Sequence, residues 1–460
     1  MAPASFPPKQ LASKTRSPGS VAAVVQSVGA KFFIIAINAA TGILTARALQ
    51  PAGRGELAAM ILWPVFLASA LTFGLPCAIT FRLRSNPEQA SRLVGTALVL
   101  AALTGILGSL AGILFMQAWI PQYSPNIILF ARIFVLNTPM AAVLMVGRAA
   151  LESQGDFTAS NKLITIPPAL TLVWLLVLWF SGSLTPVNAA FAYVIVGVPP
   201  FIWMLARLRR MFRPSLGSFI ASSRYLLSYG IRAYGIDLCG TMSAYIDQAL
   251  VVRALAAEMM GTYVVALSLS RVLNAFHASV VMVLFPKAVN QPRDVVRQMT
   301  SRAARISTTL TAMAGIGIVL CGPHLLSLLY GREYATATTV LRILVFEVVL
   351  SGATFVLCQA FMALERPGVV TAFQVIGLFM TLPLLVILVP RLGIVGAGLA
   401  LLISTSVRLV FVLASFPLFL KMPIPNIFPK LEDLRFVFSH ASQMLLRLRG
   451  KSLSTVEGTD

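Results

Sequence analysis

The chain has 460 residues, of which 58% are apolar and only 11% are charged. Soluble domains are roughly one quarter charged, so this composition excludes a water-soluble enzyme. The 36 Lys and Arg residues against 15 Asp and Glu give a net charge of +21, and the position of that charge decides whether it indicates nucleic acid or membrane topology. The sequence predicts an integral membrane protein.

Apolar runs predict an all-α, polytopic protein with about twelve transmembrane helices, because each crossing needs about 20 apolar residues. Residues 1–20 are Pro/Ser-rich and basic, which predicts a disordered cytoplasmic tail. The predicted spans lie near 21–46, 56–81, 93–117, 126–147, 161–181, 185–206, 225–252, 260–285, 303–320, 336–363, 368–389 and 394–420. Residues 431–448 have apolar residues at helical spacing and predict an amphipathic helix, on the inner leaflet or packed on cytoplasmic loops.

The cations are distributed unequally between the two sides of these spans. The termini and the connectors on their side hold 25 of them, the opposite connectors hold 5, and 6 lie within spans. Such a bias predicts that both termini are cytoplasmic. The basic excess therefore indicates topology, and no nucleic-acid partner is expected.

An internal repeat divides the chain. Residues 44–57 and 250–263 are identical at five of fourteen positions at an offset of 206, and 132–133 match 342–343 at an offset of 210. Parallel repeats of this kind are a transporter architecture with the substrate path between the halves. We predict two pseudo-symmetric six-helix lobes, 21–206 and 225–420, around a central cavity, with a cytoplasmic linker at 207–224 and a cytoplasmic amphipathic tail at 421–460.

Polar residues of the first predicted span lie on one helical face, since steps of three, four and seven residues return to the same side. They are Ser27, Lys31, Asn38, Thr41 and Thr45, and the seventh span repeats the pattern with Tyr234, Asp237, Thr241, Tyr245 and Gln248. The offset of 206 places Asp237 over Lys31. In one interpretation Lys31 binds an anionic head group while Asp237 tunes it or carries a coupling proton; in the other, the two form a structural ion pair between the halves.

Nine charged side chains lie inside predicted spans, six cations and three acids. Because each costs about 2.5 kcal/mol or more at a helix centre, they should face protein or water, and their cationic excess suits an anionic passenger. Arg132 and Arg342 match in the repeat and form an outer phosphate relay or reach toward head groups. Asp247 lies off the Asp237 face and is predicted to bond Arg253 or a neighbouring helix. The predicted substrate-binding residues are Lys31, Asn38, Arg132, Arg232, Asp237, Tyr245, Gln248, Arg271 and Arg342.

Motifs for catalysis are absent from the sequence. It contains no G-x-x-x-x-G-K-[ST], HExxH or GxSxG motif and no Cys/His cluster, and its four cysteines lie in or beside apolar runs. We therefore expect no enzyme activity, no metal site and no cofactor.

Several outer turns carry a family resemblance. Gln50-Pro51-Ala52-Gly53-Arg54-Gly55-Glu56-Leu57 resembles the L-G-P-x-G-R-G-E-L turn of polysaccharide-export flippases, with Gln50 in place of the usual Gly. Met260–Ala266 resembles the family's G-x-Y-x-x-A, Phe285-Pro286 its F-P, Leu329–Tyr334 its L-Y-G-x-x-Y, and Gly393–Ala397 its G-I-x-G-A. The likeness covers about 25–420 and points to the lipid-linked oligosaccharide flippases of the multidrug/oligosaccharidyl-lipid/polysaccharide exporter superfamily.

The resemblance implies two lobes around a cationic cavity, in the bacterial inner membrane. It implies outward movement of polyprenyl-pyrophosphate-linked oligosaccharide by alternating access, for a surface polysaccharide such as lipopolysaccharide or exopolysaccharide. Membrane lipids, a polysaccharide polymerase and a chain-length regulator are the expected partners, and coupling to the membrane potential, H⁺ or Na⁺ stays open. The alternatives are a drug or metabolite antiporter of the same superfamily, a polytopic glycan polymerase or ligase, and a non-transporting scaffold.

Overall fold

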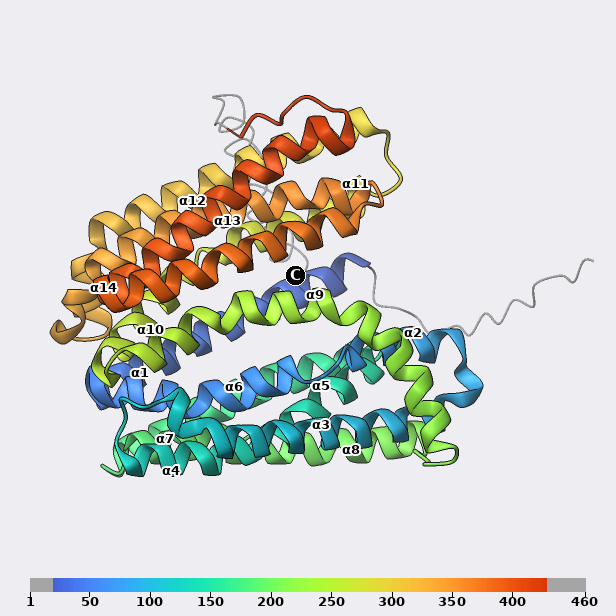
Figure 1. The fold of residues 1–460 in the computed structure, drawn as a ribbon, viewed down its shortest axis with the longest axis horizontal. Helices are drawn as coiled ribbons and strands as arrows, with labels where there is room; N and C mark the ends of the chain where they lie inside the picture. The colour runs from blue at the N-terminus through green and yellow to red at the C-terminus, as the bar shows by residue number, and fades with distance from the viewer. Residues whose placement is uncertain (1–19, 428–460) are drawn as a thin grey trace, which may run out of the picture.

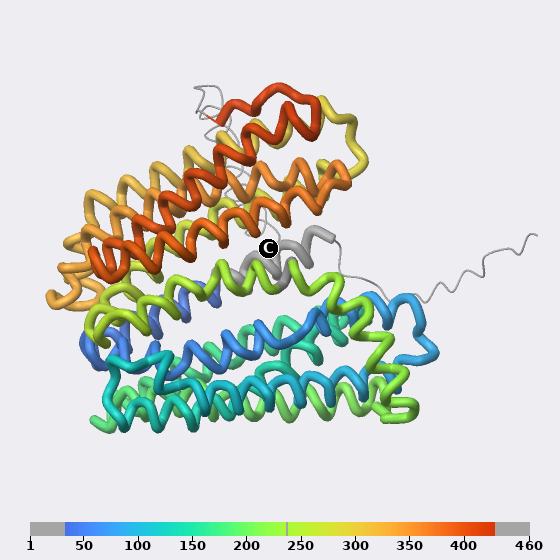
Figure 2. The backbone as a smooth tube through the Cα atoms, viewed as in Figure 1, coloured from blue at the N-terminus to red at the C-terminus, as the bar shows by residue number. Residues whose placement is uncertain are grey.

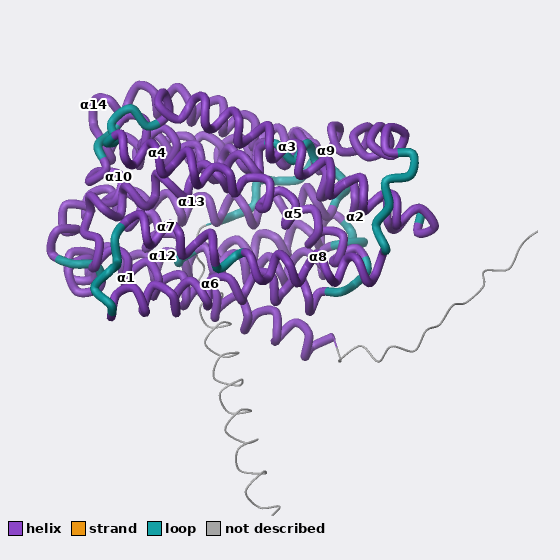
Figure 3. The backbone as a smooth tube through the Cα atoms, turned by 90° about the horizontal axis from the view of Figure 1, so that it is seen from below, coloured by secondary structure: helices purple, strands orange, loops and turns teal. Residues whose placement is uncertain are grey.

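The computed structural model describes residues 20–427, with side chains from Phe33 onward except those of Ile236 and Asp237. Helices joined by short loops make up this part of the chain, which contains no strand (Figure 3). The predicted all-α class is therefore confirmed. The predicted tails at 1–20 and 431–448 lie outside the described residues, apart from Ser20, and the bounds of the two predicted lobes stay a prediction.

The helices follow one another with little intervening chain. The main ones are α1 (Ser20–Ala70), α2 (Leu75–Ser85), α3 (Ala90–Trp119), α4 (Pro125–Phe134), α5 (Thr138–Ser153), α6 (Phe157–Phe180), α7 (Pro186–Ile195), α8 (Val198–Phe212), α9 (Phe219–Ala254), α10 (Ala257–Arg271), α11 (Asn274–Ala288), α12 (Arg293–Leu329), α13 (Thr338–Ala363) and α14 (Pro367–Ser415). Short turns η1 (Pro87–Gln89), η2 (Val135–Asn137), η3 (Arg332–Ala337) and η4 (Phe416–Leu420) lie beside them.

Nine helical segments of the described chain are long and apolar enough to cross a membrane, so the protein is a multi-pass integral membrane protein. Two of the nine, Phe33–Ala70 and Pro367–Leu420, contain a non-helical residue with positive φ, Gln50 (58°) and Gly393 (59°). The blue part of the tube, in which the first of these kinks lies, turns back at one end of the molecule (Figure 2). If each such segment is counted as two crossings and α9 is added, the total equals the twelve spans that the sequence predicts, and this count stays a prediction.

The helices differ from the apolar runs in two respects. The run at 56–81 is interrupted after Ala70, where Phe73 and Gly74 have φ of 46° and 70°, and α2 begins at Leu75. α12 starts ten residues before the predicted span at 303–320 and ends nine residues after it. Hydropathy identifies only the apolar part of a helix, which lies in lipid. The main-chain hydrogen bonds of the helix extend beyond it into charged sequence, as far as a turn such as the one at Asn290 (φ 62°).

Two groups of helices are arranged with α1 and α9 between them (Figure 1). One group holds α2 to α8 and the other α10 to α14, and the groups lie closest at the end where α1 reverses. We call this end the outer end, because the charge bias predicts that it faces outward, and the opposite end, which holds α2, the basic end.

Buried apolar residues form three clusters, and their distribution differs between the two ends. At the outer end a single core includes residues of both groups, for example Leu57, Phe134, Tyr263 and Leu341. At the basic end, one core joins α2, α3, α5 and the start of α9, and a separate core joins α11 to α14. The two groups are thus packed together at the outer end and separately at the basic end.

Candidate cargo site between the two helix groups

The predicted polar residues of α1 and α9 lie between the two groups, on the helices that separate them. Asn38 and Arg232 are exposed, while Tyr245 and Gln248 are half-buried. The Tyr245 ring packs edge-on against Phe66 of α1, with centroids 6.3 Å apart. The main chains of Lys31 and Asp237 lie in α1 and α9, but their side chains lie outside the described residues.

Asp247 anchors a charged cluster on the side of α9 that faces α10. Its carboxylate is fully buried, accepts a hydrogen bond from the Tyr263 hydroxyl at 2.7 Å, and lies 3.7 Å from the Arg271 guanidinium. The prediction that Asp247 bonds a neighbouring helix is thereby confirmed. Separating this pair would leave the buried Asp247 carboxylate without a compensating charge, which is unfavourable. Asp247 therefore keeps the Arg271 side chain, which is 38% exposed, at the middle of the bundle.

A second set of charged residues lies on α13 and α14 of the second helix group. Glu347 of α13 accepts a hydrogen bond from the Thr405 hydroxyl of α14 at 2.8 Å. Arg408, Arg271 and Asp247 all act electrostatically on Glu347. Four ionisable side chains from α9, α10, α13 and α14 thus form a network that cancels in formal charge.

The two matched arginines differ in their surroundings. Arg132, in the last turn of α4, is half-buried and its Nε is enclosed without a hydrogen-bond partner. Arg342, in α13, is exposed. Of the predicted site residues whose side chains are described, only Arg271 pairs with an oppositely charged residue, and that partner, Asp247, was outside the predicted set.

The outer end is closed by a reciprocal backbone contact. A Cβ at Gly55 would overlap the carbonyl oxygen of Ala257, and a Cβ at Gly261 would overlap the carbonyl oxygen of Pro51. Position 261 is 55 plus 206, and 257 is 51 plus 206, so each half makes the same contact on the other. This is the pattern of a two-fold interface, with small residues that let α1 and α10 approach closely.

Three hydrogen bonds tie α1 to the other group beside this contact. The Nε of Arg47 donates to the Leu329 carbonyl at 2.8 Å, and its Nη2 donates to the Leu328 carbonyl. The Tyr334 hydroxyl donates to the Ala46 carbonyl at 3.1 Å. All the acceptors are main-chain carbonyls, near the end of α12 or on α1. These hydrogen bonds therefore depend on how the two helices are placed, and not on the identity of the acceptor side chains.

Arg54 is the least expected feature of the outer end. It is 9% exposed, and its Nε and Nη1 have no hydrogen-bond partner in the described structure. Tyr193, Tyr330 and Tyr334 lie within its electrostatic range. Sequence reasoning treated Arg47 and Arg54 only as outward-facing cations, although the glycines on both sides of Arg54 were a signal of close packing.

At the basic end, α9 contacts the first group through side chains and, beside Gly74, through closely packed backbone. The Arg82 guanidinium lies 3.7 Å from the centroid of the Tyr225 ring, and the Tyr225 hydroxyl accepts a hydrogen bond from Asn86 at 2.7 Å. Phe81 and Tyr229 stack with centroids 4.4 Å apart. These contacts hold the first half of α9 against α2.

Comparison with known proteins adds a family and a sequence relative. The profile of the family described as polysaccharide biosynthesis protein matches residues 44–339. The protein named probable low-salt glycan biosynthesis flippase Agl15, from Haloferax volcanii, is 25% identical over 193 residues. The alignment covers 41% of this chain and 41% of that protein, so less than half of the curated relative is matched.

Solved structures share the fold. The structure titled lipid II flippase MurJ, inward closed conformation, superposes with a TM-score of 0.73 at 14% identity and covers 93% of each chain. An inward-facing multidrug resistance MATE family transporter gives a TM-score of 0.66 at 15% identity, with 84% of this chain and 95% of that chain covered. An outward-facing MATE structure gives 0.59 at 15% identity, with 85% and 93% covered.

Proposed function

The chain belongs to the polysaccharide biosynthesis protein family, and on that basis we propose that it is a flippase for lipid-linked oligosaccharides. In this proposal it moves a polyprenyl-pyrophosphate-linked glycan from the cytoplasmic to the outer leaflet of the inner membrane, during synthesis of a surface polysaccharide. Movement is by alternating access between the two helix groups. The partly aligned glycan flippase relative and the likeness of fold to a lipid II flippase support the substrate class.

One observation carries the proposal: the helix groups share a core at the outer end and have separate cores at the basic end. Between them run α1 and α9, with the polar residues of the predicted cargo site. A transporter that takes up its cargo from the cytoplasmic side must be closed at the outer end and separated at the basic end while the cargo enters. The higher TM-score against the inward-facing than the outward-facing MATE structure agrees with such a state.

The charge of the membrane-embedded region favours an anionic cargo over a cationic drug. Six cations and three acids lie within the predicted spans. A pyrophosphate head group carries negative charge, and its outward movement is assisted by an inside-negative potential, worth about 2.3 kcal/mol per charge per 100 mV. In the proposal Lys31, Asn38, Arg232 and Arg271 contact the head group, and Asp237 tunes Lys31 or carries a coupling proton. The potential, H⁺ or Na⁺ supplies the driving force.

Reconstitution tests the proposal. Liposomes that contain the purified protein and a fluorescent polyprenyl-pyrophosphate disaccharide in one leaflet are treated with a membrane-impermeant glycosidase, which reports the share of glycan exposed. We expect protein-dependent movement of the glycan between leaflets and no movement of a cationic dye. Movement of the dye without the glycan would favour the drug antiporter and overturn the flippase proposal.

A further inference from the structure

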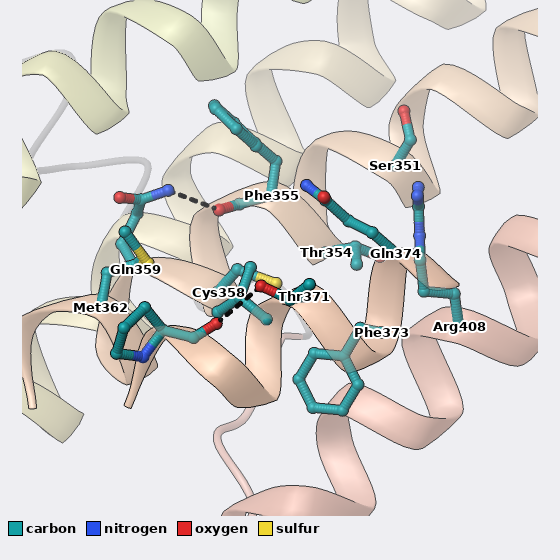
Figure 4. A pocket seen from close by; sticks show the side chains of 12 residues that line it. Ser351, Thr354, Phe355, Cys358, Gln359, Met362, Thr371, Phe373, Gln374 and Arg408 are labelled. Atoms are coloured by element: carbon teal, nitrogen blue, oxygen red, sulfur yellow. Dashed lines mark hydrogen bonds between the residues drawn. The ribbon is translucent and has the colours of Figure 1, made fainter. Parts of the chain in front are cut away.

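A pocket inside the second helix group is not accounted for by the cargo site. It lies between α13 and both halves of α14, and none of its lining residues belongs to α1 or α9 (Figure 4). Its volume is about 260 Å³, somewhat below the range for drug-sized ligands and suited to a single head group. The polar part of its lining consists of Ser351, Thr354, Gln359, Thr371, Gln374 and Arg408.

Arg408 is the chemically decisive residue of this pocket. It forms no hydrogen bond or ion pair with any described residue, and its Nε is buried without a partner. Glu347 lies within electrostatic range, but its carboxylate accepts the hydrogen bond of Thr405. Glu347 offsets the charge of Arg408 from a distance, but a guanidinium has five N–H donors, and inside a membrane-spanning bundle these donors still need strongly accepting partners.

The remaining polar groups of the pocket present acceptors. The hydroxyls of Ser351, Thr354 and Thr371 donate to main-chain carbonyls of their own helices at 3.2, 2.8 and 3.3 Å. A hydroxyl that has given its proton away keeps lone pairs for another donor. The Oε1 of Gln374 is likewise buried without a partner.

This combination selects one ligand chemistry. The guanidinium requires strong acceptors, whereas the surrounding oxygens require donors, and a phosphate that carries neighbouring hydroxyl groups supplies both. We propose that the pocket binds such a hydroxyl-bearing phosphate, either the head group of phosphatidylglycerol or free glycerol phosphate. A bare anion leaves the acceptors unused, and a cation is repelled by Arg408.

The position of the pocket gives access from the basic end. Met362 and Pro367 flank the turn between α13 and α14, and both are exposed. Arg408 lies further along the bundle from this turn, so the phosphate binds away from the exposed opening. The site goes beyond the transport proposal, because it stands whether or not the chain moves a glycan.

Ligand-dependent unfolding of the purified full-length protein tests the site. With glycerol 3-phosphate as the probe, we expect a concentration-dependent rise in the unfolding temperature, from which Kd follows. Arg408→Gln should weaken binding about tenfold or more, because a charge-assisted contact is lost. Arg391→Gln is the matched control, since Arg391 is an exposed arginine near the outer end of α14, and it should bind as the wild type does.

Two further measurements distinguish phosphatidylglycerol from free glycerol phosphate as the ligand, and provide a test that does not depend on the folding of Arg408→Gln. Thr354→Val keeps the shape of the side chain and should weaken glycerol 3-phosphate about fivefold, the effect of one hydrogen bond, with inorganic phosphate unaffected. Native mass spectrometry from phosphatidylglycerol nanodiscs should show one lipid retained by wild type and lost in Arg408→Gln. Lipid retention without a response to glycerol 3-phosphate identifies phosphatidylglycerol as the source. Equal behaviour of wild type and Arg408→Gln with both probes overturns the proposal.

Discussion

At the outer end the two helix groups share one hydrophobic core, whereas at the basic end each group packs around a core of its own. The outer contact joins main chain to main chain at Gly55 and Gly261. The basic contact joins α9 to α2 through the side chains of Tyr225 and Tyr229, and through backbone where a Cβ at Gly74 would overlap the Gly230 carbonyl oxygen. The two contacts differ in what they join, since the outer contact joins the two groups and the basic contact joins α9 to the first group.

The difference indicates where the molecule can separate. The second helix group, α10 to α14, contacts the first through α1 and the outer core, while α9 packs against α14 of the second group and against α2 and α3 of the first. A change of state must therefore break the outer contact and form a new one at the basic end. The predictions below test these two ends in order of expected effect.

The largest effect is expected between the two ends, at the charges on α1 and α9. Lys31→Ala and Asp237→Ala should each abolish glycan movement in the liposome assay. The first removes a cationic contact of the anionic head group, and the second removes the carboxylate that tunes Lys31 or carries a coupling proton. Unfolding temperatures should stay near that of wild type. Lys162→Ala, which removes an exposed cation of α6, serves as the control. Wild-type transport by either variant would remove that residue from the site.

The next largest effect is expected at the reciprocal glycine contact. Gly55→Leu and Gly261→Leu should each lower the free energy of unfolding by about 1–3 kcal/mol, since a side chain is forced into closely packed backbone. The two values should be similar because the contacts are equivalent in the repeat. Thermal unfolding measures both, with Gly240→Ala as the control at a position with open space. A large difference between the two glycine variants would contradict the two-fold contact.

A smaller effect is expected from the hydrogen bonds beside the glycines. Arg47→Gln and Tyr334→Phe should each weaken outer closure by about 1 kcal/mol, the contribution of a typical hydrogen bond, because each loses a main-chain acceptor on the partner group. The readout is the rate at which an impermeant maleimide labels a cysteine at position 49, which should rise in both variants. Unchanged labelling would show that these bonds do not hold the outer end closed.

The smallest effect is expected at the basic end. Arg82→Gln removes the cation–π contact with Tyr225 and should destabilise the protein by about 0.5–1 kcal/mol. Labelling at position 49 should be the same as in wild type, because the outer contact is intact. If labelling changed as much as in Arg47→Gln, the two ends would not be independent in this state.

Much of the fold follows from the sequence because membrane insertion makes hydropathy decisive. The all-α class and the breaks at Gln50 and Gly393 were predicted, and the offset of 206 residues agrees with the reciprocal contact of Gly55 and Gly261. The interruption at Phe73 and Gly74 was missed, because it lies inside an apolar run and depends on close packing of Gly74 against Gly230 of α9.

The site was less accessible to sequence reasoning. A helical wheel places Asp247 off the Asp237 face, but it cannot show that Tyr263 and Arg271 of α10 surround the carboxylate. Arg54 was counted as a surface cation because charge counting has no term for burial. The pocket at Arg408 depends on how α13 and α14 pack, which no local pattern in the chain specifies.

The central claim is that the outer contact must open for glycan to cross, and reversible cross-linking tests it most directly. Arg47→Cys and Leu329→Cys, in a chain whose native cysteines are replaced, are joined in cells by a short thiol-reactive linker with a cleavable disulfide. We then measure the leaflet location of radiolabelled polyprenyl-pyrophosphate glycan. We expect glycan to accumulate in the cytoplasmic leaflet when the linker is in place and to reach the outer leaflet again after reduction. Export at the same rate with the linker in place would contradict the account.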